Sequence, residues 1–213
     1  MMTVCTNACT VAALAFSLSL QSTRVLLEQA LDEPTRITLK DVRLGDAIEL
    51  ITEQTGVEIV MPQEVMNLVP HGADTLIHEV EIAGVPLRRG LTELLTPLGM
   101  KFAVVENHVE IMPKEALLCL GRPATWDELD ALAELSALEP GLKDSALESL
   151  RLRFQFRLRE PGAWERLSQT IRNIGAGPGD EILTVACAQL GWGWCLSGKH
   201  FVVTPLEEQI IAR

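Results

Sequence analysis

The chain has 213 residues, of which 47% are apolar, so it can form one substantial domain or two small domains with separate cores. Its 29 acidic and 18 basic side chains give a formal net charge of −11. Because this charge repels nucleic-acid phosphates and anionic membrane surfaces, the composition argues against nucleic-acid binding.

The N-terminal segment contains an uncharged apolar run, VAALAFSLSL, at residues 11–20. This run has the length of the apolar region of a signal peptide and is too short to span a bilayer. No Lys or Arg precedes it, so a loosely ordered start of the chain is the alternative interpretation. We predict a signal peptide over residues 1–22, a periplasmic or otherwise extracytoplasmic mature protein, and no stable membrane insertion after cleavage.

Residues 23–61 predict helices and strands in alternation. A short helical lead-in over residues 23–34 ends at Pro34. Residues 36–42 and 57–61 alternate apolar and polar side chains, as strands do. Between them, apolar residues recur at helical spacing until Gly56, a residue typical of helix C-termini. The helical positions are Leu44, Ala47, Ile48 and Ile51.

Residues 62–113 continue the series after one helical turn expected around residues 65–68. A third strand is predicted at 76–82, followed by a second helix and a hairpin over 101–113 that turns at Glu106 and Asn107. One face of the third strand is expected to carry Leu76, His78, Val80 and Ile82. The buried stripe of the helix is Leu87, Leu91, Leu94, Leu95 and Leu98. The predicted order is β-α-β-β-α-β-β.

Residues 114–149 predict a connector with a helix at 126–138, which begins near Thr125 and has Asp127 and Glu128 in its first turn. Residues 150–159, LRLRFQFRLR, alternate as a strand with one apolar face and one polar, arginine-rich face. A helix after Gly162, then a second helix and a hairpin, complete the series. Residues 208–213 form a tail.

An internal repeat links the two halves, because residues 85–113 align with residues 177–205 without a gap at an offset of 92. Seven positions are identical, where composition alone would give about two. The identical pairs are Pro86/Pro178, Leu91/Leu183, Thr92/Thr184, Leu98/Leu190, Gly99/Gly191, His108/His200 and Pro113/Pro205. We therefore predict an α+β fold with two small β-α-β-type modules, at residues 35–113 and 150–207. Each module has two amphipathic helices packed on short strands and a C-terminal hairpin, and the second module lacks the middle strands.

The runs ITLKDVRLGDAIELITEQTGVEIVMPQEV and VEIAGVPLRRGLTELLTPLGMKFAVVENHVEIMP resemble the secretin and TonB N-terminal short domain. That family has a strand, an amphipathic helix and a strand, followed by a second helix and a final hairpin. The resemblance covers residues 35–113, and residues 150–205 are similar to a degenerate second copy. It implies a small noncatalytic module outside the cytoplasm that contacts other proteins of an envelope secretion or uptake system. No plug, barrel or secretin channel domain follows in the sequence, so a transport role is not implied.

Four residues are candidate contacts for a partner or a ligand: Trp192, Arg151, Arg153 and Arg157. Trp192 lies at a helix-to-strand turn, where it could contact a ligand at the surface, but burial in the core is the favoured interpretation for the aromatic residues of this hairpin. Arginines bind carboxylates and phosphates well. The alternative is that these arginines pair with the acidic side chains of the chain itself, or protect a strand edge from aggregation.

The sequence shows no arrangement of nucleophile, base and acid that is typical of an enzyme, and no spacing typical of a zinc site. We therefore predict no catalysis, no cofactor and no metal. His108 and His200 could form a paired ligand site, but polar residues near a hairpin turn are the simpler interpretation. The predicted function is protein–protein interaction through a strand edge or a helix face. The alternative is a peptide- or glycan-binding module that uses the cleft between the two units.

The cysteines of the second module are not expected to form a disulfide. Cys187 and Cys195 align with Leu95 and Ala103, and Ala103 alternates with apolar neighbours that face the core. Cys195 should therefore point away from the helix that carries Cys187, whereas a disulfide needs converging Cβ atoms.

Overall fold

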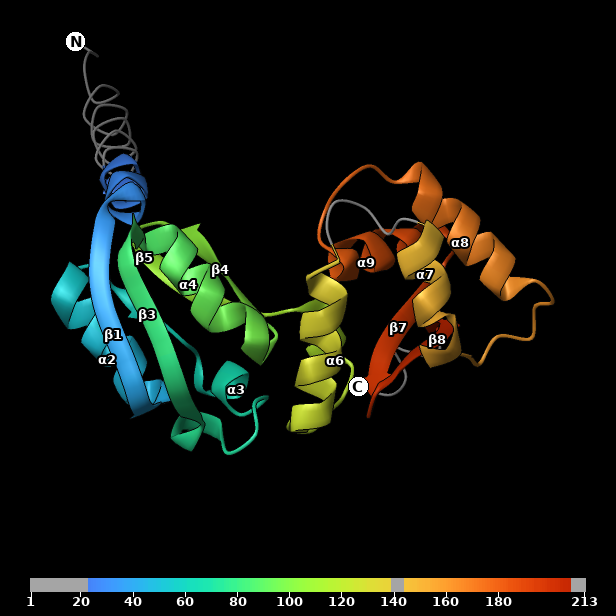
Figure 1. Cartoon of the computed structure of the whole chain (residues 1–213), viewed down its shortest axis with the longest axis horizontal. Helices are drawn as coiled ribbons and strands as arrows, with labels where there is room; N and C mark the ends of the chain where they lie inside the picture. Colours follow the sequence, from blue (N-terminus) through green and yellow to red (C-terminus); the bar gives the residue numbers. More distant parts are fainter. Residues whose placement is uncertain (1–22, 139–143, 208–213) are drawn as a thin grey trace, which may run out of the picture. The chain divides into compact units, whose positions relative to one another are not determined.

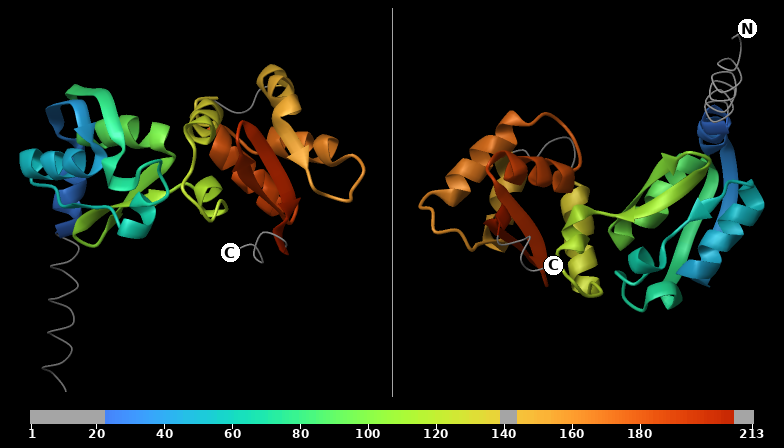
Figure 2. Two further views of the ribbon diagram at one scale, coloured as in Figure 1. Left: turned by 90° about the horizontal axis from the view of Figure 1, so that it is seen from below. Right: turned by 180° about the vertical axis from the view of Figure 1, so that it is seen from behind.

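The computed structural model describes residues 23–138 and 144–207. In this part of the chain, the protein is α+β, with small sheets covered by helices (Figures 1 and 2). The chain divides into two compact units. Unit 1 contains the described residues up to Pro62 together with Leu76–Glu93 and Phe102–Met112. Unit 2 contains Gln63–Thr75, Leu94–Lys101 and the described residues from Pro113 onward. The predicted signal peptide and the tail at 208–213 lie outside the described residues.

The first half of the chain follows the predicted order of strands and helices. After a helix over residues 23–32, its elements are β1 (Pro34–Arg43), α2 (Leu44–Thr55), β2 (Ile59–Val60), α3 (Gln63–Met66), the 3-10 turn η1 (Gly72–Asp74), β3 (Leu76–Pro86), α4 (Leu87–Leu95), the 3-10 turn η2 (Thr96–Leu98), β4 (Met100–Val105) and β5 (His108–Pro113). β1 and β3 pair antiparallel as a two-stranded sheet, and β2, β5 and β4 form a second sheet in that order. Helices α2 and α4 lie between the two sheets (Figures 1 and 2).

The helical stripes predicted for α2 and α4 are confirmed, because all of their apolar positions are buried. Helix α2 ends at Gly56, whose φ of 68° is left-handed and whose amide donates to the Thr52 carbonyl at 2.9 Å. A residue with a Cβ is strained in this conformation, so glycine suits the end of the helix.

The face predicted for β3 is wrong at its start, where Leu76 is 41% exposed and Ile77 is buried. The strand pairs that flank the change of phase are Val42–Ile77 and Lys40–Glu79. Asp41 lies between them on β1 with a φ of 51°, and its carboxylate contacts the His78 ring at 3.4 Å. A left-handed residue interrupts the alternation of a strand. Strand β3 therefore buries the odd-numbered Ile77 before this point and the even-numbered Ile82 after it.

The remaining elements form unit 2 with α3, η1 and η2. They are α5 (Glu115–Leu118), α6 (Trp126–Ser136), α7 (Asp144–Leu150), the 3-10 turn η3 (Arg151–Arg153), β6 (Phe154–Phe156), α8 (Ala163–Asn173), α9 (Gly179–Gln189), β7 (Trp192–Ser197) and β8 (His200–Pro205). The sheet order is β6-β8-β7, with β6 parallel and β7 antiparallel to β8. Helix α9 packs on β7, and α8 packs on α9.

The strand predicted at 150–159 is wrong over most of its length. Leu147 and Leu150 are buried at helical spacing in α7, and the chain continues as η3 before β6 begins at Phe154. Leu152, predicted to be inward, is 91% exposed. The helix therefore uses the first apolar residue of the alternating run, and tertiary packing overrides the local strand pattern.

The repeated segments keep the same geometry at equivalent positions. β2 pairs with β5 through Ile59 and Val109, and β6 pairs with β8 through Phe154 and Phe201, which aligns with Val109. Gly99 and Gly191 have φ values of 67° and 70°. Their carbonyls accept the aligned amides of Lys114 at 2.8 Å and Leu206 at 3.1 Å. The two copies thus share a helix, a left-handed glycine and a hairpin closed by the same hydrogen bond.

The two copies differ in what covers their helix, and glycines mark each close approach. In α4, a Cβ on Gly90 would lie 2.5 Å from the side chain of Ile82 on β3, whereas the aligned residue of α9 is Ile182. Conversely, Leu87 of α4 aligns with Gly179 of α9, whose Cβ would overlap the Leu135 carbonyl of α6. Strand β3 therefore covers the first helix, and α6 contacts the start of the second.

Replacing Gly179 with alanine is expected to destabilise the protein by about 1 to 3 kcal/mol, the usual cost of overpacking. The added methyl group would meet backbone atoms of Leu135, which cannot rotate away. Gly175→Ala is the control, because no atom lies within 4 Å of the built Cβ at that position. Urea denaturation measures both changes, and equal midpoints for the two variants would contradict the close contact between α6 and α9.

Candidate functional site

Trp192, the first candidate contact, is buried. It is 3% exposed, and the guanidinium of Arg166 on α8 lies 5.2 Å from the centroid of its ring. The core interpretation favoured from the sequence is confirmed, and the surface contact suggested by its place at a turn is wrong, because β7 already begins at this residue. The aligned residue Met100 is also buried, at 1% exposure. Trp192 therefore presents little of its surface to a partner.

Arg151 and Arg153 are occupied by contacts within unit 2. Arg151 donates to Glu148 at 3.2 Å and lies 5.7 Å from the centroid of the Trp164 ring. Arg153 donates to Glu134 at 2.5 Å and lies 4.9 Å from the centroid of the Phe201 ring. Both side chains thus cover aromatic rings of unit 2. Their ion pairs agree with the alternative interpretation, in which the arginines pair with acidic side chains of the chain itself.

Arg157 lines a cavity of about 570 Å³ at one end of the sheet in unit 2. The parallel strands β6 and β8 both end here, and the Arg157 amide donates to the Val203 carbonyl at 2.8 Å. Arg159 and Trp192 line the same cavity. Among the residues that the structure describes, no carboxylate pairs with either arginine. The structure thus brings Trp192 and Arg157 together, and it places Arg151 and Arg153 elsewhere.

A second cavity, of about 280 Å³, follows β7 between helices α5 and α9. Leu118 and Cys119 of α5 and Cys187 of α9 line it, together with residues 192–194 of β7. It shares Trp192 and Leu206 with the cavity at Arg157. The two cavities therefore meet at the start of β7.

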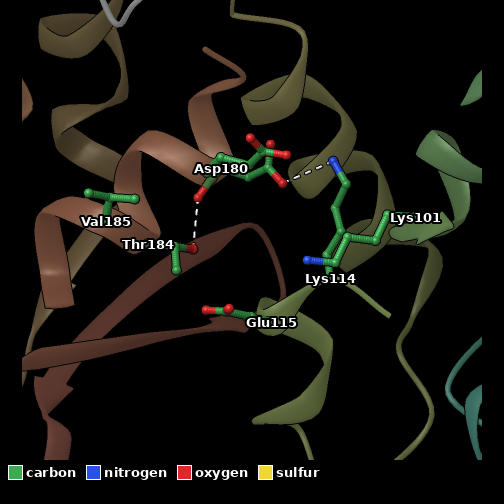
Figure 3. A pocket seen from close by; sticks show the side chains of 7 residues that line it. Lys101, Lys114, Glu115, Asp180, Thr184 and Val185 are labelled. Atoms are coloured by element: carbon green, nitrogen blue, oxygen red, sulfur yellow. Dashed lines mark hydrogen bonds and ion pairs between the residues drawn. The ribbon is translucent and has the colours of Figure 1, made fainter. Parts of the chain in front are cut away.

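A third cavity, of about 210 Å³, lies at the start of α9 (Figure 3). Lys114 is directed toward Asp180, and their charged atoms are 2.9 Å apart. These side chains are 12% and 5% exposed, and Lys114 also donates to the Ser136 hydroxyl at 2.8 Å. Asp180 Oδ1 is buried and accepts no hydrogen bond. The ion pair links α6, α9 and the start of α5 and is a structural feature.

Glu128 is the most highly connected carboxylate in the described residues, and it also has a structural role. Its side chain is 1% exposed and accepts two hydrogen bonds from Arg122, at 2.7 and 2.9 Å. The amides of Thr125 and Gly198 donate to it at 2.9 and 3.1 Å. Burial alone would raise the pKa of Glu128, but these hydrogen bonds outweigh it and lower the pKa to about 2. A carboxylate so stabilised is a poor general base.

The cysteines in the described residues, Cys119, Cys187 and Cys195, form no disulfide, as predicted for the last two. Burial raises the pKa of Cys187 to about 12, so this thiol stays protonated. Burial also raises the pKa of Cys195, with an opposing contribution from Arg157. Cys119 Sγ lies 3.3 Å from the Trp194 carbonyl. Neither Cys187 nor Cys195 has the lowered pKa of a nucleophile.

No group of three or more metal-binding side chains is arranged to hold a metal ion within residues 23–138 and 144–207. His108 is partly buried and His200 is exposed, each at the start of its hairpin's second strand. None of the helices in the described part of the chain is both long and apolar enough to cross a membrane.

A scan against models of known protein families finds no match to this chain, and a search of curated proteins finds none either.

Sequence reasoning missed three features of unit 2: the buried ion pair, the contacts of Glu128 and the cavity at Arg157. A signal existed only for Glu128, because Thr125 and Glu128 have the spacing of a capping box, which the structure contains. The other two features join residues that are far apart in the sequence. No local pattern could have found them.

Proposed function

We propose that this chain is a noncatalytic interaction module of the secretin and TonB N-terminal short domain type that binds another protein by strand pairing. The observation that carries the proposal is the β1–β3 sheet, which has only two strands, of 10 and 11 residues. Within the described residues, no strand pairs with the outer edge of either one. A row of unpaired backbone groups is the surface that β-augmentation uses.

The arrangement of the first half of the chain supports the proposed family. Its elements follow the order β-α-β-β-α-β-β with two helices between short sheets, which is the kind of module that the resemblance implies. The signal-like run at residues 11–20 supports a place outside the cytoplasm. The proposed partner is a component of an envelope secretion or uptake system.

Strand β3 is the proposed docking edge. Glu79 and Glu81 are exposed on it, and Leu76 at its start is 41% exposed. Acidic side chains at alternate positions pair favourably with basic side chains on a facing strand. We therefore expect a partner strand that carries Lys or Arg at alternate positions. The same charges keep two copies of this edge from pairing with each other.

A photo-crosslinking amino acid at Glu81, expressed in the native host, tests the proposal. We expect crosslinks to one envelope protein, and no such crosslinks from the same amino acid at Glu53, an exposed position on α2. Crosslinks to cytoplasmic proteins, or equal patterns from both positions, would contradict the proposed function.

Proline substitution distinguishes strand pairing from other contacts at this edge. Successive amides of a strand point to opposite edges. Of the two variants Val80→Pro and Glu81→Pro, one therefore removes a hydrogen-bond donor from the outer edge of β3, and the other removes a hydrogen bond between β3 and β1. The variant that keeps the melting temperature of the wild type is the informative one. It is expected to lose the crosslink, and a crosslink that persists would exclude strand pairing at that position.

A further inference from the structure

We propose that unit 2 docks an acidic amphipathic helix of a partner protein at the end of its sheet, where Gly191 lines the cavity of about 570 Å³. This surface is distinct from the β1–β3 edge, so the inference goes beyond the proposed function and does not depend on it. The two copies of the repeat differ at this point, because a helix covers the surface in the first copy and leaves it open in the second.

Gly99 shows what covers this surface in the first copy. The residue is buried, and its φ of 67° is left-handed. A Cβ built on it would lie 2.8 Å from the side chain of Leu117 on α5 and 2.9 Å from that of Leu132 on α6. Leu132 belongs to a buried stripe of α6 with Leu129 and Leu135. The leucine face of an amphipathic helix therefore closes the end of the first copy.

Gly191 is the aligned residue of the second copy, and it is exposed. Its φ is 70°, and its carbonyl accepts the Leu206 amide as the Gly99 carbonyl accepts the Lys114 amide. Apart from its chain neighbours, no atom of the described residues lies within 4 Å of a Cβ built on Gly191. The backbone is thus the same in the two copies, whereas the covering leucines are present only in the first.

Apolar side chains around Gly191 are correspondingly less buried. Leu206 is 43% exposed, and Leu158 and Leu190 are half-buried in the wall of the cavity. In the first copy, the residue aligned with Leu190 is Leu98, which is 4% exposed in the turn that α6 contacts. Exposed leucines that a helix covers in the equivalent copy favour a helix as the occupant.

The sequence after β8 does not repeat the covering residues. At the offset of 92, the buried Ala116 and Leu117 of α5 align with Glu208 and Gln209. Two polar residues do not replace the apolar contacts that Leu117 makes in the first copy. We therefore assign the helix to another protein.

The charges around the cavity favour an acidic helix. Arg157 and Arg159 are exposed, and no carboxylate pairs with them in the part of the chain that the structure describes. Glu160 in the same wall is already paired with Arg166. With Glu207 as the other acidic lining residue, one positive charge remains in excess. Carboxylates on the flank of a docked helix would pair with the two arginines, and such complementarity selects the partner.

Fluorescence anisotropy with three synthetic helices tests the proposal on the full chain. The peptides have about 18 residues, a length that allows a helix in water. The first has leucines on one face and Glu with Gln on the other, and the second has Lys in place of Glu. The third has the composition of the first, with its leucines dispersed around the helix. The acidic amphipathic helix is expected to bind roughly tenfold more tightly than either of the others. Equal binding of the acidic and basic helices, or no binding of the acidic one, would overturn the inference.

Charge reversal assigns the site. The double variant Arg157→Glu/Arg159→Glu should prefer the basic helix, because the exposed side chains change only the sign of their charge. Arg36→Glu/Lys40→Glu is the matched control, since it changes the net charge equally at exposed positions of β1 and should keep the wild-type preference. An unchanged preference for the acidic helix in the first variant would refute the site.

A measurement on the wild type holds whether or not these variants fold. The acidic helix should shift the methyl NMR signals of Leu158, Leu190 and Leu206, and unchanged signals would exclude docking at this surface.

Two further outcomes would point to other occupants. If residues 208–213 occupied the surface, Ile210→Ser/Ile211→Ser would raise the affinity for the acidic helix, whereas we expect no change. If a second copy occupied it, the chain alone would form a dimer that the acidic helix dissociates, whereas we expect a monomer. Either of these results would refute the assignment to another protein. Helix binding by a chain whose Glu81 position gives no crosslinks, or the reverse, tells failure of the proposed function from failure of this inference.

Discussion

Lys114→Ala is expected to lower the free energy of unfolding by about 3 to 5 kcal/mol, because removal of one partner leaves the other charge buried without compensation. The Lys114 and Asp180 side chains are 12% and 5% exposed, and their charged atoms are 2.9 Å apart. Without the ammonium group, the Asp180 carboxylate loses its ion pair, and its Oδ1 already accepts no hydrogen bond. Urea denaturation at neutral pH measures the change.

The repeat supplies a matched control for this prediction. Arg88 of α4 aligns with Asp180 and forms ion pairs with Glu28 at 2.5 Å and with Asp32 at 3.0 Å, but these three side chains are 39 to 66% exposed. An exposed pair contributes about 0 to 1 kcal/mol, so Arg88→Ala should cost far less than Lys114→Ala. The double variant Lys114→Met/Asp180→Leu should recover most of the loss, because no charge then remains buried. Similar losses for the variants at 88 and 114 would show that solvent screens both pairs alike.

Burial patterns with a short period could be predicted from the sequence. The stripes of α2 and α4 are confirmed because apolar side chains at positions i, i+3, i+4 and i+7 can be buried together only in a helix. The hairpins and Gly99 were predictable for a similar local reason, since a helix that turns back into a strand favours a left-handed residue at the turn. The repeat supports both predictions, because the same pattern of apolar residues and glycine occurs in both copies.

Features that depend on distant packing were not predictable. The run at 150–159 alternates as a strand, yet Leu150 completes the buried face of α7 and Leu152 is left exposed. The burial of Trp192 had a signal in the repeat, since the aligned Met100 begins a strand in the same way and is also buried. The cavity at Arg157 needs the ends of β6, α9 and β8 to meet, and no pattern in the sequence brings these ends together.

Glu128→Gln is expected to lower the free energy of unfolding by about 3 kcal/mol at pH 7, since the pKa of Glu128 falls from its usual 4.5 to about 2 in the folded protein. The carboxylate is 1% exposed and accepts hydrogen bonds from the Gly198 amide, 70 residues away, and from Arg122, so it joins the start of α6 to the β7–β8 turn. An amide group in its place would turn an N–H toward one of these donors.

The pH dependence separates loss of this charge from a general packing defect. A carboxyl group with a lowered pKa in the folded state stabilises the protein fully above its unfolded pKa, and this contribution disappears as the pH falls through the folded pKa. The difference between wild type and Glu128→Gln should therefore be constant above about pH 5 and shrink steadily between pH 4.5 and about 2. Asp130→Asn, at an exposed position of the same helix, should stay within about 0.5 kcal/mol of wild type throughout. If the loss of unfolding free energy in Glu128→Gln does not change down to pH 2, the side chain at this position stabilises the protein through its packing and not through its charge.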